Sequence, residues 1–135
     1  MDYDLSDEQV TFQKVVRDFA TSEIAPHAER WDAEHLFPLD TVLAMGELGL
    51  FGLPFPEEYG GSGADFTTLC LAIEELGRVD SSMAITLSAG VGLGANPIYR
   101  FGNDDQREHG AESAHGCRFG YRVGGARARL GERPR

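Results

Sequence analysis

Adjacent glutamates are the residues of this chain that come closest to a catalytic arrangement. One pair is Glu57 and Glu58, and the other is Glu74 and Glu75. General acid–base catalysis needs a carboxyl group whose pKa is shifted by a pocket, whereas glutamate pairs in acidic proteins mostly lie on solvated faces. We therefore interpret both pairs as solvated surface, and we assign no catalytic residue.

Three other patterns each lack a part that their chemistry requires. Residues 90–94 read Gly-Val-Gly-Leu-Gly, which is not the G-x-G-x-x-G spacing of a dinucleotide-binding loop, and no strand precedes them. No G-x-S-x-G sequence or Cys/His pairing points to a nucleophile. The histidines lack metal-ligand spacing and have no cysteine or aspartate cluster beside them; they are His27, His35, His109 and His115. We expect neither a metal site nor a dinucleotide loop.

The elements that would position a site are helices. Residues 81–99 carry no charge, and residues 81–101 are apolar nearly all round. A helix without a polar face is expected to be buried on all sides, and this run is too polar and too broken by glycine and proline to span a membrane. Each interior glycine costs a helix about 1 kcal/mol, so we expect close approach of another backbone or of a ligand.

A stiff loop and an amphipathic helix precede this segment. Prolines fix the backbone at positions 54 and 56, and the glycines at 60, 61 and 63 permit turns with positive φ. From Asp65, a suitable N-cap, to Val79 the spacing predicts a helix. Its predicted apolar face is Phe66, Leu69, Cys70, Ile73 and Leu76, with Thr67, Glu74, Glu75 and Arg78 facing elsewhere.

The N-terminal part predicts further helices. Ser6 and Gln9 fit a capping box, and an apolar face follows at Phe12, Val15, Val16 and Phe19. Pro26 should kink this helix or begin another. A short helix over about 39–48 should turn Val42, Leu43 and Leu48 inward and end at Gly49. The fold class is therefore all-α, an up-and-down helical bundle.

Two stretches at this spacing resemble one known family. Gly-Leu-Pro-Phe-Pro-Glu-Glu-Tyr-Gly-Gly at 52–61, followed by Ala-Ile-Glu-Glu-Leu-Gly-Arg-Val-Asp-Ser-Ser at 72–82, is similar to the N-terminal helical domain of the acyl-CoA dehydrogenases. The resemblance covers about residues 3–108. It implies desaturation of an acyl-CoA thioester between the α and β carbons, with hydride transfer to FAD and an electron-transfer flavoprotein or similar acceptor. It also implies a homo-oligomer in the full-length family.

The resemblance also implies where this domain meets its substrate. The helix over residues 81–101 corresponds to one that lines the slot for the fatty acyl chain, so Thr86, Ala89, Gly90 and Leu93 would face that slot. Small and apolar side chains suit such a groove, and simple core packing is the alternative. The flavin-binding walls and the catalytic base of the family have no counterpart in these 135 residues. We therefore expect a truncated dehydrogenase, inactive alone, or else a stand-alone helical interaction or acyl-binding module without redox chemistry.

Charge divides the chain at the point where the resemblance ends. Residues 1–108 carry 20 acidic and 6 basic side chains, while residues 109–135 carry 6 arginines and 2 glutamates. The acidic body argues against nucleic-acid or membrane binding, and the N-terminus lacks a signal peptide. With two cysteines and no C-x-x-C motif, we expect a reducing, cytoplasmic location. Residues 109–135 form a Gly/Ala/Arg-rich tail that we expect to be irregular or disordered. We interpret it as a frameshift product or a mis-called open reading frame, and translation of the DNA in its other two frames would test this interpretation.

Overall fold

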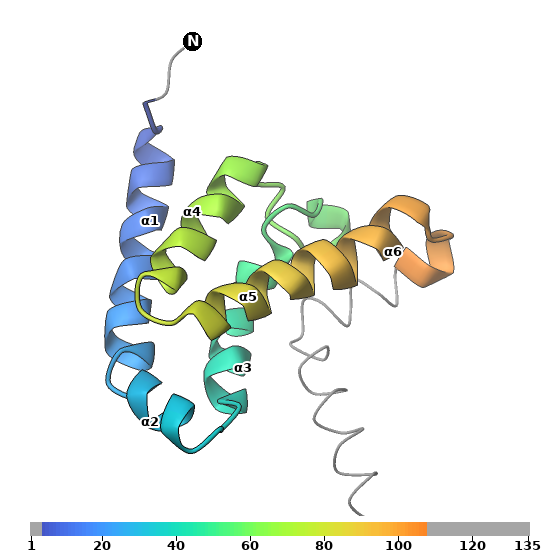
Figure 1. The fold of residues 1–135 in the computed structure, drawn as a ribbon. Helices are drawn as coiled ribbons and strands as arrows, with labels where there is room; N and C mark the ends of the chain where they lie inside the picture. The colour runs from blue at the N-terminus through green and yellow to red at the C-terminus, as the bar shows by residue number, and fades with distance from the viewer. Residues whose placement is uncertain (1–3, 108–135) are drawn as a thin grey trace, which may run out of the picture.

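The computed structural model describes residues 4–107, and within that range it is all-α with no strand (Figure 1). The tail predicted from residue 109 onward, with its proposed boundary, lies outside the described residues. The α-helices are α1 (Asp7–Phe19), α2 (Ala28–Ala33), α3 (Leu39–Glu47), α4 (Phe66–Gly77), α5 (Ser81–Ala89) and α6 (Asn96–Phe101). Two π-helical segments follow α1 and α5, at Ala20–Ile24 and Gly90–Ala95, and short 3-10 turns lie at Leu50–Gly52 and Glu57–Tyr59.

The helix starts follow their sequence signals. At α1 the Gln9 amide donates to Ser6 Oγ over 3.2 Å and the Ser6 amide donates to Gln9 Oε1 over 3.1 Å, which confirms the capping box. Asp65 accepts from the Thr68 amide at the start of α4, and Asp80 accepts from the amides of Ser82 and Met83 at the start of α5. Each cap pairs backbone donors that the first helical turn cannot satisfy.

Glycines hold the loop between α3 and α4 in two different ways. Gly49, Gly60 and Gly63 have φ values of 81°, 77° and 62°, a region that side chains rarely adopt. Gly61 has ordinary φ, but a Cβ on it would lie 2.0 Å from the carbonyl oxygen of Phe55. Backbone bonds cross the loop here, because Gly63 donates to Phe55 and Ala64 donates to Leu53, each over 2.8 Å. The loop is therefore a closely packed unit.

One core joins all the layers of the bundle. Its most completely buried side chains come from α1, α3, α4, α5 and the segments that follow them: Val16, Ile24, Met45, Leu50, Leu76, Met83, Leu87 and Val91. Val42 is buried as predicted, whereas Val15 and Leu48, predicted to face inward, are exposed. These two side chains lie at the edges of their helices' apolar stripes, where one residue step turns a side chain by about 100°.

Helix α4 presents a different face to the core than its spacing predicted. Leu69, Ala72 and Leu76 are buried, but Phe66 is 53% exposed and Cys70 is also exposed. Leu71 and Glu75 are buried in their place. The buried face is thus rotated by about one residue, or roughly 100°, because α4 packs between α1 and α5 and turns Glu75 toward α1.

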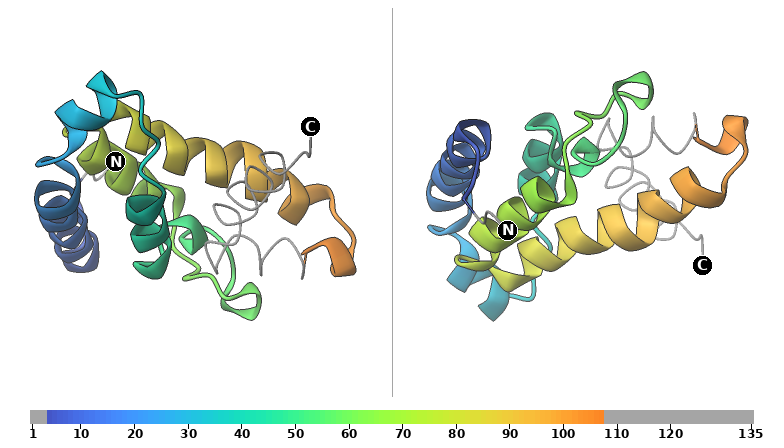
Figure 2. Two further views of the ribbon diagram at one scale, coloured as in Figure 1. Left: turned by 90° about the horizontal axis from the view of Figure 1, so that it is seen from below. Right: turned by 90° about the horizontal axis from the view of Figure 1, so that it is seen from above.

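The helical segment from α5 to α6 lies along one side of the bundle. In Figures 1 and 2 it runs as one long, gently bent rod, with α1, α3 and α4 all on its inner side. Met83, Leu87 and Val91 are buried against them, while Ile85, Leu93 and Phe101 are 66%, 81% and 86% exposed. The prediction that this segment is buried on all sides is therefore wrong for the described residues, since its outer face has no neighbouring layer. Within residues 4–107 no helix has the length and hydropathy needed to cross a membrane.

Candidate acyl-binding site

The four residues predicted to line the acyl slot lie on consecutive turns of the α5–α6 segment. Thr86 and Ala89 are half-buried in α5, and Gly90 is half-buried at the start of the π-helical segment. Leu93, inside that segment, is largely exposed. The Thr86 hydroxyl donates to the Ser82 carbonyl over 2.8 Å, so its methyl group can contribute apolar surface. The row changes from half-buried to exposed toward α6.

The π-helical segment explains why Leu93 departs from the predicted row. In an α-helix, residues 86, 90 and 93 fall on one face, but this segment makes wider turns. The Asn96 amide donates to the Val91 carbonyl, which is an i→i+5 bond. A π-helical turn contains more residues than an α-helical turn. Residues after it are therefore rotated backward about the helix axis, relative to their α-helical positions. Such turns are frequent at functional sites.

Close packing in the core, and not open space for a ligand, explains why residue 90 is a glycine. A Cβ on Gly90 would lie 2.9 Å from Cε1 and 3.1 Å from Cδ1 of Phe51, a buried ring of the α3–α4 loop. The close approach expected at these glycines thus occurs here with a side chain of the same domain. By contrast, a Cβ on Gly92 would meet no atom within 4 Å.

We expect Gly90→Ala to lower the free energy of unfolding by about 1–3 kcal/mol, because the new methyl group overpacks against the Phe51 ring. Phe51→Leu in the same chain should recover part of that loss, and urea denaturation of both single variants and the double variant measures the coupling. Strict additivity of the two substitutions would show that the ring is not what Gly90 accommodates.

Aromatic side chains join the far end of the segment to the stiff loop. Tyr99 of α6 packs edge-on against Phe55, with ring centroids 5.5 Å apart, and against Tyr59 at 5.9 Å. Edge-to-face pairs of this kind are worth about 0.5–1.5 kcal/mol beyond the area they bury. The loop is therefore a fixed wall beside the helix that carries the predicted slot residues.

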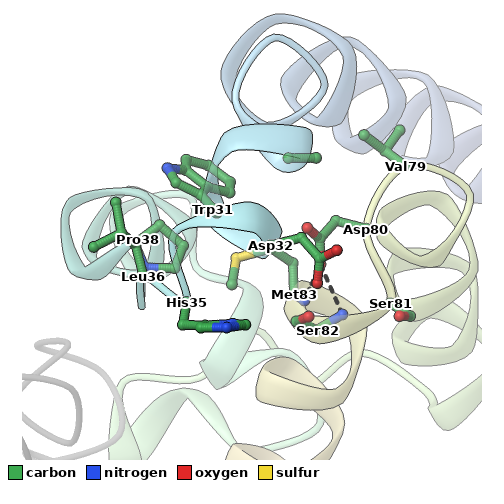
Figure 3. Close-up of a pocket in the computed structure, with 11 residues that line it drawn as sticks. Trp31, Asp32, His35, Leu36, Pro38, Val79, Asp80, Ser81, Ser82 and Met83 are labelled. Atoms are coloured by element: carbon green, nitrogen blue, oxygen red, sulfur yellow. Dashed lines mark hydrogen bonds between the residues drawn. The ribbon is translucent and has the colours of Figure 1, made fainter.

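A pocket of about 490 Å³ lies at the other end of α5 (Figure 3). It is bounded by the α2–α3 connection and the start of α5, and none of the four predicted slot residues lines it. Its lining is Ala28, Trp31, Asp32, His35, Leu36, Pro38, Val79, Asp80, Ser81, Ser82 and Met83. The Asp80 carboxylate is engaged there in capping α5. Among residues 4–107 no group of three or more histidine, cysteine or acidic side chains is placed to hold a metal ion.

A buried carboxylate is the polar feature that sequence interpretation missed. Glu75 is 2% exposed, although both of the glutamates at 74 and 75 were predicted to be solvated. Arg17 binds it through two bonds, Nη2 to Oε1 at 2.7 Å and Nε to Oε2 at 2.9 Å. Gln13 and Arg78 donate to it at 2.9 and 3.2 Å. The hydrogen bonds from Arg17 lower the pKa of Glu75 despite its burial, and the charges of Arg17 and Arg78 add to the effect.

This cluster ties α1 to α4 and has the character of a structural ion pair. All three donors point at Glu75, and Arg17 and Arg78 are about half exposed, so the cluster has a solvated outer side. The signal in the sequence was the spacing of Glu75 and Arg78, which are three residues apart on α4 and can pair on a helix surface. The partner on α1 could not be recognised from spacing.

The described residues show no glycine-rich phosphate loop for a flavin dinucleotide. Such a loop at the N-terminus of a helix is one arrangement that binds the phosphates of these cofactors. The glycines at 90, 92 and 94 instead lie inside a continuous helical segment, where the intervening amides donate within the helix. We therefore derive no chemical step through FAD from these residues.

The comparisons with known proteins agree with this architecture. The family profile of the acyl-CoA dehydrogenase N-terminal domain matches residues 6–112. A probable acyl-CoA dehydrogenase, YngJ of Bacillus subtilis, is 49% identical over 108 residues, which are 80% of this chain and 28% of that protein. A short-chain specific acyl-CoA dehydrogenase of Clostridium acetobutylicum is 38% identical over 108 residues, which are again 80% of this chain and 28% of that protein. The chain therefore belongs to the acyl-CoA dehydrogenase family and spans a little over a quarter of the curated relatives that it matches.

Solved structures show the same fold. A structure of the electron transferring flavoprotein of Acidaminococcus fermentans aligns with a TM-score of 0.82 at 42% identity, over 86% of this chain and 31% of that one. Glutaryl-coenzyme A dehydrogenase in complex with glutaryl-CoA aligns with a TM-score of 0.83 at 36% identity, over 87% and 31% of the two chains. An acyl-CoA dehydrogenase of Bacillus anthracis in complex with FAD aligns with a TM-score of 0.76 at 37% identity, over 84% and 20%.

Proposed function

We propose that this chain forms the N-terminal helical domain of an FAD-dependent acyl-CoA dehydrogenase and supplies one wall of its acyl slot. The observation that carries the proposal is the row of half-buried Thr86, Ala89 and Gly90 on an uncharged helix, beyond which the displaced Leu93 is exposed. Apolar surface of this kind favours methylene groups by about 0.8 kcal/mol per buried CH₂. The packed loop around Tyr99 keeps that wall in place.

The reaction we propose for the whole enzyme is desaturation of an acyl-CoA thioester, with FAD as the hydride acceptor and an electron-transfer flavoprotein as the next acceptor. Relatives solved with glutaryl-CoA and with FAD support this assignment. The contribution of these residues is to hold and orient the acyl chain. The buried carboxylate of Glu75 is not free for catalysis because it is fully engaged in the α1–α4 ion pair. We propose that the 135 residues alone do not catalyse the reaction.

A stand-alone acyl-binding or interaction module without redox chemistry is the second candidate. The observation in its favour is that the glycines at 90, 92 and 94 are helical and form no phosphate loop. Flavin absorbance that persists through purification would favour the flavoenzyme, and it would exclude a module that works without flavin.

Acyl-CoA binding is the experiment that tests the proposed slot. We expect calorimetric titration of the chain with thioesters of four, six and eight carbons to show affinity rising with chain length, by at most about fourfold per added methylene group, which is the limit for a fully buried CH₂. Ala89→Phe should weaken binding of the eight-carbon thioester by about tenfold or more, since the ring would occupy the space that we propose for the acyl chain beside Thr86.

Ser88→Phe is the matched control, because Ser88 precedes Ala89 on α5 but is exposed. It adds the same volume to the outer side of the helix and should leave acyl-CoA affinity unchanged. Affinity that does not depend on chain length, or equal losses in the two variants, would contradict the slot.

A further inference from the structure

The pocket at the start of α5 is bounded by two aromatic side chains and by acidic and hydroxyl groups. Trp31 of α2 is only 8% exposed, and the ring of His35, in the α2–α3 connection, lies on the same side of the pocket (Figure 3). Asp80 and Ser82, at the start of α5, lie across the space from these rings. A volume of about 490 Å³ is within the range of small-molecule sites.

His35 lines this pocket despite a strained backbone. Its φ is 54°, and it is the one non-glycine residue with positive φ in the described range. The Leu36 amide donates to the Trp31 carbonyl over 2.9 Å, and the His35 amide donates to the Asp32 carbonyl over 3.2 Å. This is a common way to end a helix, and glycine is the usual residue at the position of His35. Strained residues of this kind cluster at ligand sites, so we infer that the ring is retained for a contact beyond the helix end.

The polar groups of the pocket favour a cation over an anion. The Asp80 carboxylate already accepts from the amides of Ser82 and Met83 over 2.7 and 3.1 Å, so the amides that could bind an anion at this helix start are occupied. The Asp32 carboxylate has no hydrogen bond or ion pair with another described residue, and no lysine or arginine lines the pocket. An anion would therefore meet two carboxylates, whereas a cation would be attracted by both.

The lining also favours an organic cation over a metal ion. In the part of the chain that the structure describes, no three histidine, cysteine or acidic side chains are placed to coordinate a metal. Aromatic rings attract organic ammonium groups through their faces. Leu36 and Met83 add apolar surface on which a hydrocarbon body can pack.

We propose that this pocket binds a small alkylammonium ion, with its charged group at Asp32 and Asp80 and its hydrocarbon body against Trp31, His35 and Met83. The proposal goes beyond the proposed acyl slot and does not depend on it, because no slot residue lines this pocket. Asp32 is exposed and Asp80 is half-buried, so water screens the charges. Binding should therefore be weak, with half-saturation on the order of 1–10 mM.

Tryptophan fluorescence of the full chain tests the proposal, because Trp31 is the only tryptophan in the sequence. Butylammonium chloride should change this fluorescence and saturate on the order of 1–10 mM. At about pH 8 an alkylammonium ion is charged and an imidazole is neutral. Butanol lacks the charge, butyrate has the opposite charge, and magnesium chloride lacks the hydrocarbon body, so none of them should saturate in this range at matched ionic strength. The chemical shift of the Met83 methyl group is a second readout and should move with the same midpoint.

Asp32→Asn should weaken butylammonium binding about threefold to fivefold, which is the effect of losing a partner in an exposed ion pair. Asp40→Asn is the matched control, because Asp40 is an exposed residue at the start of α3 that does not line the pocket. It removes the same charge and should change binding less than about twofold. Circular dichroism verifies that both variants fold.

His35→Gly separates a role in binding from a role in folding. Glycine adopts a φ of 54° without strain, so the thermal midpoint should stay the same or rise, while butylammonium binding weakens. Unchanged binding in this variant would overturn the proposal, because the ring would then not be a wall of the site. No saturable change in either readout, an equal response to butanol, butyrate or magnesium chloride, or equal effects of Asp32→Asn and Asp40→Asn would also overturn it.

Discussion

Gly61→Ala should be the most damaging of the substitutions considered for this chain, with a loss of at least about 3 kcal/mol in the free energy of unfolding. A Cβ at this position would lie 2.0 Å from the oxygen and 2.5 Å from the carbon of the Phe55 carbonyl, and 2.6 Å from the Gly52 oxygen. All three are backbone atoms, so no side-chain rotation can relieve the overlap. The loop would have to open.

The expected loss has consequences beyond the loop. Opening it would break the backbone bonds from Gly63 to Phe55 and from Ala64 to Leu53, and would displace Phe55 from Tyr99. Chemical denaturation monitored by circular dichroism measures the effect, and an insoluble or unfolded variant would agree with it.

Gly92→Ala is the matched control for Gly61→Ala. Its Cβ would meet no atom within 4 Å, and alanine has a helix propensity about 1 kcal/mol better than glycine. We expect this variant to be as stable as the parent or up to about 1 kcal/mol more stable. Comparable losses at the two glycines would contradict the close approach inferred at Gly61.

Glu75→Gln should lower the free energy of unfolding by about 2 kcal/mol at neutral pH, the range for hydrogen bonds to charged groups. The amide keeps the size of the side chain but loses the charge that receives two bonds from Arg17 and one from Arg78. The loss stays moderate because both arginines are about half exposed and can be hydrated. Glu74→Gln, at the exposed neighbouring position, should stay within about 0.5 kcal/mol of the parent.

The lowered pKa of Glu75 determines how the stability difference between the parent and Glu75→Gln changes with pH. The pKa of Glu75 in the folded chain lies below its ordinary value of 4.5, so folding favours the ionised carboxylate. Its contribution is fully present above pH 4.5 and is lost as the pH falls through the lowered pKa. The stability difference between parent and Glu75→Gln should therefore be constant near neutrality and shrink below pH 4.5. A difference that grows on acidification would contradict the lowered pKa.

Local signals in the sequence predicted local structure well. The caps at Ser6 and Asp65 and the positive φ of Gly49 and Gly60 depend on a few neighbouring residues and are confirmed. These features follow from backbone donors and steric limits that are already present in a short peptide.

Features set by packing between helices were harder to predict. The rotation of α4 was missed because a bidentate bond from Arg17, 58 residues away in sequence, turns Glu75 inward. The exposure of Ile85 and Leu93 was missed because periodicity shows that a helix is apolar, not whether a neighbour covers it. At the candidate site, α-helical spacing predicts that Thr86, Ala89 and Gly90 lie in one row. It does not predict that the π-helical segment displaces Leu93 from that row.

The aromatic contact between Tyr99 and the loop also constrains the order of events during synthesis. Tyr59 leaves the ribosome about 40 residues before the tyrosine that packs against it, a delay of some seconds at ordinary rates of elongation. Until then Phe55 and Tyr59 have no ring to pack on from the far helix. The nascent chain therefore completes this corner of the domain last, when nearly all of the described residues have been made.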